Sequence, residues 1–368
     1  MRWVFYVDLD AYYVSCERRT RPELEGRPVI VGPDPKLGPS RGVVLSASYE
    51  ARANGVHSAM PAVRAAQLCP EAIWVAPDFE KYGKVAEEVR AFLAERFGRV
   101  TALSIDEAAM YAEAEDPGAA RARAEALQAE ILQALHLPCS VGVAASRTVA
   151  KIATDEAKPG GVRVVPPEET AEFLAPLSVR AVPGVGPKTE AMLAGVGVVR
   201  IGELRSLPPS VRQKLGRFGE ELYRLARGEV EMEPEESESA PRSRSVDRTF
   251  DRDSDDIGEL EGTIDGLSEE LSKALEHEHL RYRTTTVAVR WEDFERTQRS
   301  RTLPALHEGL DPLRSEAVRL FRELWSAERR GRHRRVRTLS VGVEKLAEAA
   351  DRQVRLDQFG SSNPPGLK

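Results

Sequence analysis

The sequence lacks the features of a membrane protein or a secreted one. No apolar run approaches the roughly 18 residues that a membrane-spanning helix needs, so no contact with a membrane is expected. The N-terminal stretch acquires acids at Asp8 and Asp10, which argues against a signal peptide. Three cysteines stand far apart in 368 residues, so neither a disulfide framework nor a zinc site is expected. This usage predicts a reducing, cytoplasmic location.

The chain also lacks an excess of positive charge. Its 53 lysines and arginines face 59 aspartates and glutamates, for a formal net charge of −6 at pH 7. That balance excludes a uniformly basic surface for nucleic acid but leaves room for a local basic groove. The hydrophobic fraction of 41% is enough to build cores for several domains. At roughly 100–200 residues per domain, the length suggests two to four of them.

Strand and helix patterns alternate through the first half of the chain. The expected elements are a buried strand at 3–9, a hairpin at 100–111, a helix at 119–135 and a strand at 138–145. Ser146 can cap a helix that runs to Ala157, where Pro159, Gly160 and Gly161 stop it. This alternation favours an α/β or α+β first domain.

The second half begins with a helical region and ends in a strand-rich one. Residues 168–228 are expected to be helical, and the acidic, proline-bearing stretch 229–241 is expected to be a linker. Strands are expected at 242–250, 284–291, 298–303 and 335–346, with helices along 257–275 and 311–327. This βαββαβ order resembles a split-βαβ domain. The last twenty or so residues have no core and are expected to form a tail.

Three carboxylates form a candidate metal-binding set. Asp8 ends the first expected strand, and Asp106 with Glu107 stands near the turn of the hairpin. Carboxylates without histidine or cysteine suit Mg²⁺, and a pair of such ions roughly 3.5–4 Å apart serves phosphoryl transfer. The alternative is that Asp8 caps a turn while the other two acids decorate a loop.

Five segments occur in an order and spacing that together resemble the Y-family, DinB-like translesion DNA polymerases, especially the archaeal type. They are VDLDAYYVSCE (7–17), SASYEAR (46–52), SIDEA (104–108), KIATDEAKPGG (151–161) and VPGVGPK (182–188). The resemblance covers about residues 3–345. It implies an α+β multidomain chain shaped like a right hand. The implied parts are a ferredoxin-like palm (1–10 and 78–166), small fingers (11–77), a helix-hairpin-helix thumb (167–230), a linker (231–241), a split-βαβ little finger (242–345) and a tail (346–368).

The resemblance implies addition of dNTPs to a primer 3′ end on primer-template DNA, by a monomer. Two Mg²⁺ ions would be held by Asp8, Asp106 and Glu107, with the backbone carbonyl of Leu9. Asp10 also follows the pattern, but strand neighbours alternate faces, so its side chain is expected to point away as a structural hydrogen-bonding group. A short fingers segment implies loose checking of the new base pair. No second acidic cluster suggests a proofreading site, so low fidelity and tolerance of damaged templates are expected.

Five residues match substrate-pocket positions of that family. Tyr13 would exclude a ribose 2′-hydroxyl, and Leu45 would roof the incoming base. Tyr49 and Arg52, three apart on a helix and so on one face, would contact the triphosphate. Lys158, at a helix end, would bind phosphate as well.

Three other residues, Tyr12, Arg147 and Thr148, bear on how closely the chain follows the family pattern. Tyr12 is expected to pack within the fingers rather than line the sugar site. The pair Arg147 and Thr148 departs from the Asn-Lys pair that is common in the family, which puts one contact in doubt.

Two regions are expected to hold DNA. In VPGVGPK, Gly184 and Gly186 permit a tight turn whose amides face a phosphate, and Lys188 adds a charge. LGRFG (215–219) is either a second, weaker copy or a plain turn.

In the C-terminal region, residues 253–278 carry ten acids and one lysine, whereas the strands are rich in arginine. We therefore expect an acidic helix layer and a basic sheet layer that lies along DNA phosphates. The arginines chosen as contacts are Arg242, Arg244, Arg335 and Arg337.

The tail contains QVRLDQF, in which Gln353, Leu356 and Phe359 have the Q-x-x-L-x-x-F spacing of a peptide that binds a sliding clamp. Gly360 stands where a second aromatic is common, so a modest affinity is expected. The alternative is an ordinary disordered tail.

Two other functions remain open at this point. One is a catalytically silent DNA-binding repair scaffold, and the other is a nucleotidyl cyclase built on a similar palm. The expected hairpin and basic C-terminal sheet make no sense for a cyclase.

Overall fold

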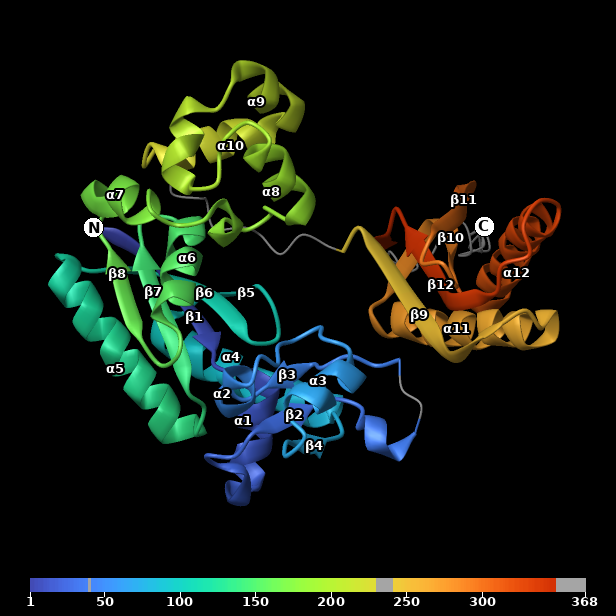
Figure 1. Cartoon of the computed structure of the whole chain (residues 1–368), viewed down its shortest axis with the longest axis horizontal. Coiled ribbons are helices and arrows are strands. Elements are labelled where there is room, and N and C mark those ends of the chain that lie inside the picture. The colour runs from blue at the N-terminus through green and yellow to red at the C-terminus, as the bar shows by residue number, and fades with distance from the viewer. Residues whose placement is uncertain (39–40, 230–240, 349–368) are drawn as a thin grey trace, which may run out of the picture. The chain divides into compact units, whose positions relative to one another are not determined.

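The computed structural model describes residues 1–38, 41–229 and 241–348. The chain forms two compact units, Met1–Glu236 and Ser237–Lys368, and each has its own hydrophobic core (Figure 1). Most of the predicted linker and the whole predicted clamp peptide lie outside the described residues. Among the described helices, none combines the length and the apolar character needed to cross a membrane.

A five-stranded sheet organises the first unit. Its order is β5 (Val100–Ala102), β6 (Glu107–Glu113), β1 (Arg2–Leu9), β7 (Cys139–Ala144) and β8 (Val162–Val165). The central strand β1 is antiparallel to both β6 and β7, and it is buried along almost all of its length. The predicted first strand and the predicted hairpin are confirmed.

Helices cover both faces of this sheet, because β1 is apolar on both sides. Trp3, Phe5 and Val7 face α4 (Phe79–Phe97) and α5 (Pro117–Leu135) in one core cluster. Val4 and Tyr6 face α6 (Arg147–Ala157) in another. Helix α6 packs so closely on β7 that a Cβ at Gly142 would lie 2.1 Å from the carbonyl oxygen of Ala150.

The predicted start of α6 is confirmed, since the Ser146 hydroxyl accepts a hydrogen bond from the Val149 amide at 3.4 Å.

The segment between β1 and α4 folds around a small sheet of order β3 (Ser46–Ala47), β2 (Val29–Val31) and β4 (Ile73–Val75). Its other elements are α1 (Tyr12–Thr20), η1 (Pro22–Leu24), η2 (Pro35–Leu37), α2 (Tyr49–Ala53) and α3 (Ala62–Leu68). Ser48 caps α2 by accepting from the Ala51 amide at 3.3 Å. The strands have two or three residues each, so this part buries only a small core.

Short helices follow β8, as predicted. They are η3 (Pro167–Glu169), α7 (Thr170–Leu174), η4 (Val179–Ala181), α8 (Pro187–Ala194), η5 (Ile201–Ser206), α9 (Pro209–Leu215) and α10 (Arg217–Ala226). Gly184 adopts φ +89° in the turn before α8, and a Cβ there would lie 3.2 Å from the Phe218 ring. LGRFG therefore forms the junction between α9 and α10 and packs on the first hairpin.

The second unit has the predicted βαββαβ order. Its elements are β9 (Ser243–Ser254), α11 (Ile257–His277), β10 (Leu280–Trp291), β11 (Arg296–His307), α12 (Leu310–Arg329) and β12 (Val336–Glu344). The sheet order is β11-β10-β12-β9, and a short strand β13 (Ala347–Glu348), which was not predicted, pairs with β10. Helices α11 and α12 pack on one face of the sheet.

The three cysteines are free and buried, in agreement with the absence of a disulfide framework. Burial raises the pKa of the Cys16 and Cys139 thiols to about 12 and that of Cys69 to about 11.

Candidate active site

A pocket of about 180 Å³ lies at the carboxyl end of β1. The chain reaches it from the end of β1, the start of α1, β3 and α2, the turn before β6, and the strap after α6. All nine residues predicted for catalysis, metal binding or substrate binding line this pocket: Asp8, Leu9, Tyr13, Leu45, Tyr49, Arg52, Asp106, Glu107 and Lys158. Residues 150 positions apart in the sequence therefore meet in one place.

Strand register brings the acids together. In the antiparallel pair β1–β6, Asp8 stands directly opposite Glu107. The Leu9 amide donates to the carbonyl oxygen of Asp106 at 3.0 Å, which fixes the turn beside the end of β1. Asp8 is only 4% exposed.

Two lysines from the KIATDEAKPGG segment neutralise the buried acids. Lys151 Nζ lies 3.0 Å from Asp8 Oδ2 and 2.5 Å from Glu107 Oε1. Lys158 Nζ lies 2.6 Å from Asp8 Oδ2. Asp155 joins them, at 2.9 Å from Lys151 and 3.2 Å from Lys158. The site is thus a network of two ammonium groups and three carboxylates.

The two central acids titrate differently. Burial alone would raise the pKa of Asp8, but its hydrogen bond with Glu107 and the charge of Lys158 outweigh that effect and lower the pKa. Burial and the hydrogen bond with Asp8 raise the pKa of Glu107, despite the nearby charge of Lys151. Burial also raises the pKa of Tyr6, whose hydroxyl donates to Glu107 at 3.1 Å. Asp8 therefore holds the more persistent negative charge.

The donor set fits a hard divalent cation. Asp8, Asp106 and Glu107 supply only oxygen atoms and all border one pocket, the chemistry that Mg²⁺ prefers. Within the described ranges, however, no three His, Cys, Asp or Glu side chains already surround a single point. Asp106 instead accepts from the Ser104 hydroxyl at 2.6 Å. Because Lys151 and Lys158 bind Asp8 and Glu107, a bound cation would compete with these ammonium groups for the carboxylates.

An aromatic wall surrounds Tyr13. Its ring centroid lies 4.7 Å from that of Tyr82 and 6.3 Å from that of Phe79, both on α4. The neighbouring Tyr12 is 2% exposed, and its hydroxyl donates to the carbonyl oxygen of Tyr82 at 2.6 Å. Tyr12 therefore contacts α4 and shares a core cluster with residues of 11–77, where its place was predicted. It also lines the pocket beside Tyr13, which was not predicted.

Tyr49 and Arg52 share one face of α2, as their spacing predicts. The Arg52 guanidinium lies 4.7 Å from the Tyr49 ring centroid, and its Nε donates to the Ala47 carbonyl oxygen at 3.0 Å. The Tyr49 hydroxyl donates to Asp10 Oδ1 at 3.2 Å, and burial raises the pKa of this phenol to about 12. Asp10 makes structural hydrogen bonds, as expected.

Sequence reasoning missed Lys151 and Asp155 as parts of this site, although both stand in a quoted segment. The only signal was their spacing of four, which also describes an ordinary surface pair on a helix. It also missed Ser140 and Gly160, which bind the Asp10 carboxylate. No local pattern announces those two contacts.

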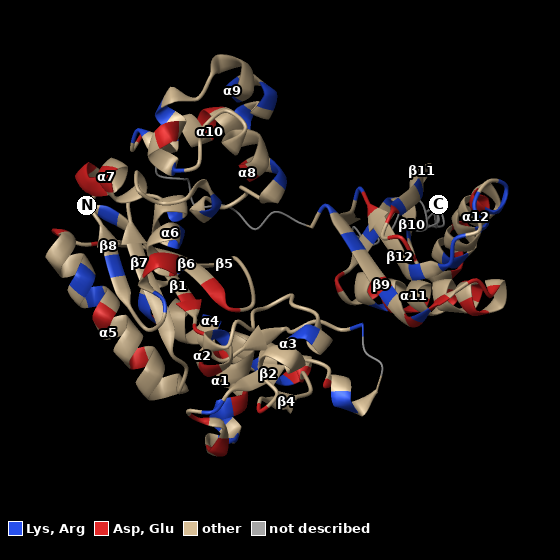
Figure 2. Ribbon diagram, viewed as in Figure 1, with Lys and Arg blue, Asp and Glu red and all other residues tan. Residues whose placement is uncertain are grey.

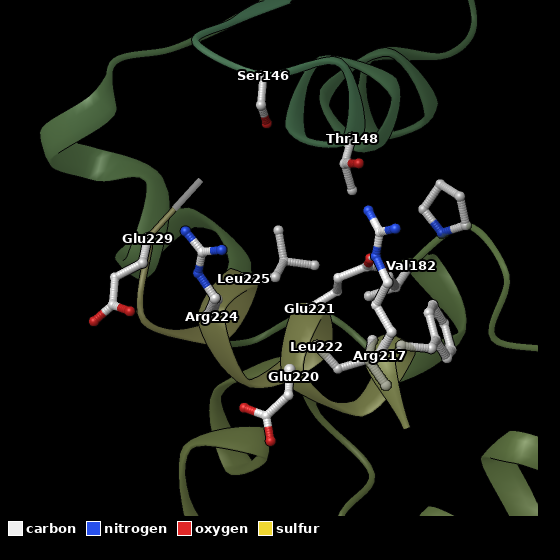
Figure 3. A pocket seen from close by; sticks show the side chains of 12 residues that line it. Ser146, Thr148, Val182, Arg217, Glu220, Glu221, Leu222, Arg224, Leu225 and Glu229 are labelled. Atoms are coloured by element: carbon white, nitrogen blue, oxygen red, sulfur yellow. The ribbon is translucent and has the colours of Figure 1, made fainter. Parts of the chain in front are cut away.

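A larger cavity of about 370 Å³ lies between the start of α6 and α10 (Figure 3). Ser146 and Thr148 approach it from α6, and Arg217 and Glu221 approach it from α10. None of the three candidate catalytic acids lines it. Its rim combines hydroxyl and guanidinium groups with the carboxylates of Glu220, Glu221 and Glu229, and Arg217 pairs with Glu221 at 2.9 Å.

The first hairpin differs in detail from the expected phosphate site. The Gly186 amide donates to the Gly184 carbonyl oxygen at 3.2 Å, so it serves the turn itself. Gly186 caps α8, and Pro187 follows it. The first free amides at this helix end belong to Lys188 and Thr189, because amides in the first turn have no partner within the helix. The exposed Lys188 side chain stands at the same end.

The second unit corrects the expected separation of charge into layers. Arg244 and Arg248 stand opposite Val343 and Leu339, core residues that face the helices. They therefore lie on the helix side of the sheet. Arg244 pairs with Glu278 of the α11 end at 2.7 Å, and Arg248 lies 3.9 Å from Glu270 of α11.

Helix α12 supplies further partners for acidic α11 (Figure 2). Arg322 binds Glu261 at 2.6 Å, and Arg314 binds Glu269 at 2.6 Å. Of the other predicted DNA contacts, Arg335 pairs with Glu292 at 2.9 Å and Arg337 lies over the Phe294 ring at 4.5 Å. Much of the arginine charge is thus engaged within this unit.

The other face of this sheet is rich in hydroxyl groups. The register aligns Thr284 with Thr302 and Thr338 with Thr249, and their hydroxyl oxygens are 2.9 and 3.0 Å apart. Further members of this face, in register with them, are Ser243, Ser245, Thr286, Ser300 and Ser340, together with the acids Asp247 and Glu344. Arg290 and Arg296 stand opposite each other at one end. Alternation along the strands places most hydroxyls on this face and Arg244 and Arg248 on the other.

Known proteins resemble both units in sequence. Residues 7–155 match the impB/mucB/samB family, and residues 241–356 match the impB/mucB/samB family C-terminal domain. DNA polymerase IV of Methanoculleus marisnigri is 41% identical over 98% of this chain and 99% of its own length. DNA polymerase IV 2 of Methanosarcina mazei is 39% identical over 97% of this chain and 96% of its own.

Solved structures resemble the chain as well. A Y-family DNA polymerase chimera of Dbh and Dpo4 has a TM-score of 0.84 at 25% identity, covering 94% of this chain and 99% of that one. An insertion ternary complex of Dbh DNA polymerase has a TM-score of 0.63 at 25% identity, with the same coverage. With the pocket at the end of β1 and full-length relatives above 30% identity, the chain belongs to the impB/mucB/samB family, the Y family of DNA polymerases.

Proposed function

We propose that the chain is a template-directed DNA polymerase that adds dNTPs to a primer 3′ end and continues past damaged template bases. The observation that carries this proposal is the single pocket that gathers Asp8, Asp106 and Glu107 with the predicted nucleotide contacts. Full-length relatives named DNA polymerase IV support it.

The reaction is attack of the primer 3′-hydroxyl on the α-phosphate of a dNTP, with release of pyrophosphate. Asp8, Asp106 and Glu107, with the Leu9 carbonyl, would hold two Mg²⁺ ions. When bound, such ions lower the pKa of a hydroxyl and stabilise charge on phosphate and leaving group. The acids compensate that positive charge, while Lys151 and Lys158 lie beside them.

The other pocket residues fit the parts of a nucleotide. Arg52 and Lys158 present cationic donors that suit phosphate oxygens. The Tyr13 ring, held by Tyr82 and Phe79, would lie against the sugar and leave no room for a 2′-hydroxyl. Leu45 also lines the pocket and would cover the incoming base.

The small sheet β3-β2-β4 is the expected fingers part. With strands of two or three residues, it offers little surface to close over a new base pair. We therefore infer loose geometric checking, low fidelity and acceptance of damaged template bases.

The DNA would be gripped through its backbone. Lys188 and the first amides of α8 suit one phosphate. In the second unit, we assign contacts to the hydroxyl-rich face together with Arg290, Arg296 and the exposed Arg242. Such contacts carry no base code, so binding is expected to be independent of sequence.

A primer-extension assay with Mg²⁺ and all four dNTPs tests the proposal. Template-dependent extension is expected, including past a single abasic site. DNA binding without any extension would favour the silent repair scaffold. Conversion of a nucleoside triphosphate to a cyclic product without a primer would favour the cyclase.

The tail is the proposed clamp-binding segment, through Gln353, Leu356 and Phe359. Calorimetry would compare the intact chain with the double variant Leu356→Ala/Phe359→Ala for binding to a sliding clamp. Loss of affinity and of clamp-stimulated extension, with unchanged basal extension, is expected. Equal affinity would eliminate this segment as the contact.

A monomeric state and a cytoplasmic location complete the proposal. The three buried free thiols agree with a reducing compartment. Sedimentation analysis across a range of concentrations tests the monomer.

A further inference from the structure

We propose that Asp10 is a positioning residue for the triphosphate end of the pocket, because its one carboxylate anchors both Tyr49 and the strap that carries Lys158. This inference rests on the proposed function for the identity of the ligand. It concerns a residue that does not line the pocket itself. Asp10 would act through the groups that do.

The Asp10 carboxylate is buried and has protein partners on several elements. Asp10 as a whole residue is 3% exposed. Its Oδ1 accepts from the Tyr49 hydroxyl at 3.2 Å, and its Oδ2 accepts from the Gly160 amide at 2.8 Å. The Ser140 hydroxyl lies 3.1 and 3.2 Å from the two oxygens. These partners come from α2, from the strap and from β7.

The backbone of Asp10 is fixed as well. Its amide donates to the Pro138 carbonyl oxygen at 2.9 Å. Its carbonyl oxygen accepts from the Ser15 hydroxyl at 2.6 Å. Because both backbone groups are tied, the carboxylate is presented from a rigid point rather than from a mobile loop.

One arm of this anchor leads to Arg52. The Arg52 guanidinium lies 4.7 Å from the Tyr49 ring centroid. A ring tethered by its hydroxyl at the far edge is a defined platform for that cation. Loosening the Tyr49 hydroxyl would therefore loosen the guanidinium that is proposed to meet the phosphates.

The other arm leads to Lys158. Gly160, whose amide is held by Asp10, stands two residues after Lys158. The same amide also lies 3.0 Å from Ser140 Oγ. Holding Gly160 restricts the position of the strap, which is residues 158–161, and thus the reach of the Lys158 ammonium group. Asp10 thereby couples two cations of the pocket that come from different elements, Arg52 from α2 and Lys158 from the end of α6.

The arrangement predicts a difference between two substitutions. Asp10→Ala removes both acceptors and leaves the Gly160 amide with Ser140 Oγ alone. Asp10→Asn keeps a carbonyl oxygen for that amide, while its NH₂ group can donate to the Tyr49 oxygen. A positioning role therefore predicts rescue by asparagine, whereas a role that depends on negative charge predicts none.

The experiment measures dNTP affinity by calorimetry on the full chain bound to primer-template with a dideoxy-terminated primer and Mg²⁺, beside steady-state extension with an ordinary primer. Asp10→Ala should weaken dNTP affinity and raise KM roughly ten- to a hundredfold, with kcat changed much less. Asp10→Asn should recover most of that loss. Tyr49→Phe, which deletes one arm and keeps the ring, should weaken affinity roughly threefold or more.

Thr170→Ala is the matched control, because it removes a buried side-chain hydrogen bond of the first unit, to the Pro166 carbonyl oxygen, at a residue that does not line the pocket. It should leave dNTP affinity within about twofold of the wild type. Thermal unfolding of every variant is measured alongside. If Asp10→Ala fails to fold, Asp10→Asn and Tyr49→Phe decide the question.

Three results would overturn the proposal. One is a Tyr49→Phe chain with wild-type affinity and KM. Another is an asparagine variant as poor as the alanine variant. The third is a loss of kcat and thermal stability with unchanged affinity. The blocked primer reports dNTP binding without chemistry. A wild-type chain that binds dNTP but extends no primer would therefore contradict the proposed polymerase function, while the affinities of the variants would still test the role of Asp10.

Discussion

The pocket of the first unit and the arginine-rich surface of the second both consist of paired charges, yet the pairs differ in burial. Lys151 and Asp8 pair with side chains 19% and 5% exposed. Arg248 and Glu270 pair with side chains 63% and 59% exposed. Exposed pairs contribute roughly 0–1 kcal/mol, so their arginines can exchange a carboxylate for a phosphate at little cost. Buried pairs release their charges only to a ligand that replaces them.

The two units should therefore respond differently to substitution. In the pocket, single side chains are irreplaceable, because each closes a buried network. On the second unit, many weak and exchangeable contacts share the task of holding DNA. Individual changes there should have small effects, while loss of the whole unit should have a large one.

The largest effect is expected for Asp106→Ala. This variant should lose nucleotide addition by roughly a thousandfold or more, because the acid serves the ions of phosphoryl transfer. Single-turnover extension measures the loss. Primer-template affinity, followed by fluorescence anisotropy, should stay near the wild-type value, because the acid does not serve the duplex. Extension at the wild-type rate, at any Mg²⁺ concentration, would remove Asp106 from the metal site.

A large effect on binding is expected for deletion of residues from 242 onward. The first unit has its own cores, so it should still fold and add nucleotides when DNA is in excess. DNA affinity should fall roughly ten- to a hundredfold, and the dependence of binding on salt should become less steep, because fewer phosphates are neutralised. Anisotropy across a salt series measures both. Full affinity in the truncated chain would contradict the assignment of DNA contacts to the second unit.

An intermediate effect on selectivity is expected for Tyr13→Ala. Without the ring, the pocket should accept a 2′-hydroxyl, and incorporation of rNTP relative to dNTP should rise by roughly tenfold or more, since a lost steric clash of 1.4 kcal/mol already gives a factor of ten. Single-nucleotide insertion with matched rNTP and dNTP measures the ratio. Phe79→Leu is a useful comparison, because it alters the support of the ring and not the ring itself. An unchanged ratio in Tyr13→Ala would move the gate elsewhere, with Tyr12 next.

The smallest effects should separate the two faces of the second unit. Arg244→Gln removes a cation that pairs with Glu278 on the helix side, so DNA affinity should change by less than about twofold. Arg290→Gln removes a cation from the hydroxyl-rich face and should weaken binding by roughly three- to tenfold, as expected for one phosphate contact. Anisotropy on the same duplex compares them. A larger loss in Arg244→Gln than in Arg290→Gln would reverse the assignment of the faces.

The sequence was sufficient for the order of elements in the second unit and for nine of the residues that line the pocket. Apolar strands with an acid at the end, and a hairpin with two acids at its turn, already place Asp8 near Glu107. The nucleotide contacts came from segment matches, because Tyr49 and Arg52 have no distinguishing chemistry of their own. Their role rests on a shape that only the folded chain provides.

What could not be predicted depended on long-range register and packing. Two partners of the Asp10 carboxylate, Ser140 and Gly160, come from 130 and 150 residues away. Arg244 could be assigned to a face only when its pairing with Val343 was known. Composition groups residues by element, whereas strand alternation divides each element between two faces. The expected basic sheet layer was wrong for that reason.

The three buried cysteines can report how often the regions that contain them open to solvent. Cys16 lies in α1, Cys139 stands opposite Leu9 in the five-stranded sheet, and Cys69 belongs to the small core around β3-β2-β4. Thiols with pKa values of about 11 or 12 contain almost no reactive thiolate at neutral pH while they stay buried. Alkylation therefore has to wait for each region to open. The three labelling rates would read the opening of the small core around β3-β2-β4 separately from that of the five-stranded sheet, and nucleotide binding should slow them unequally.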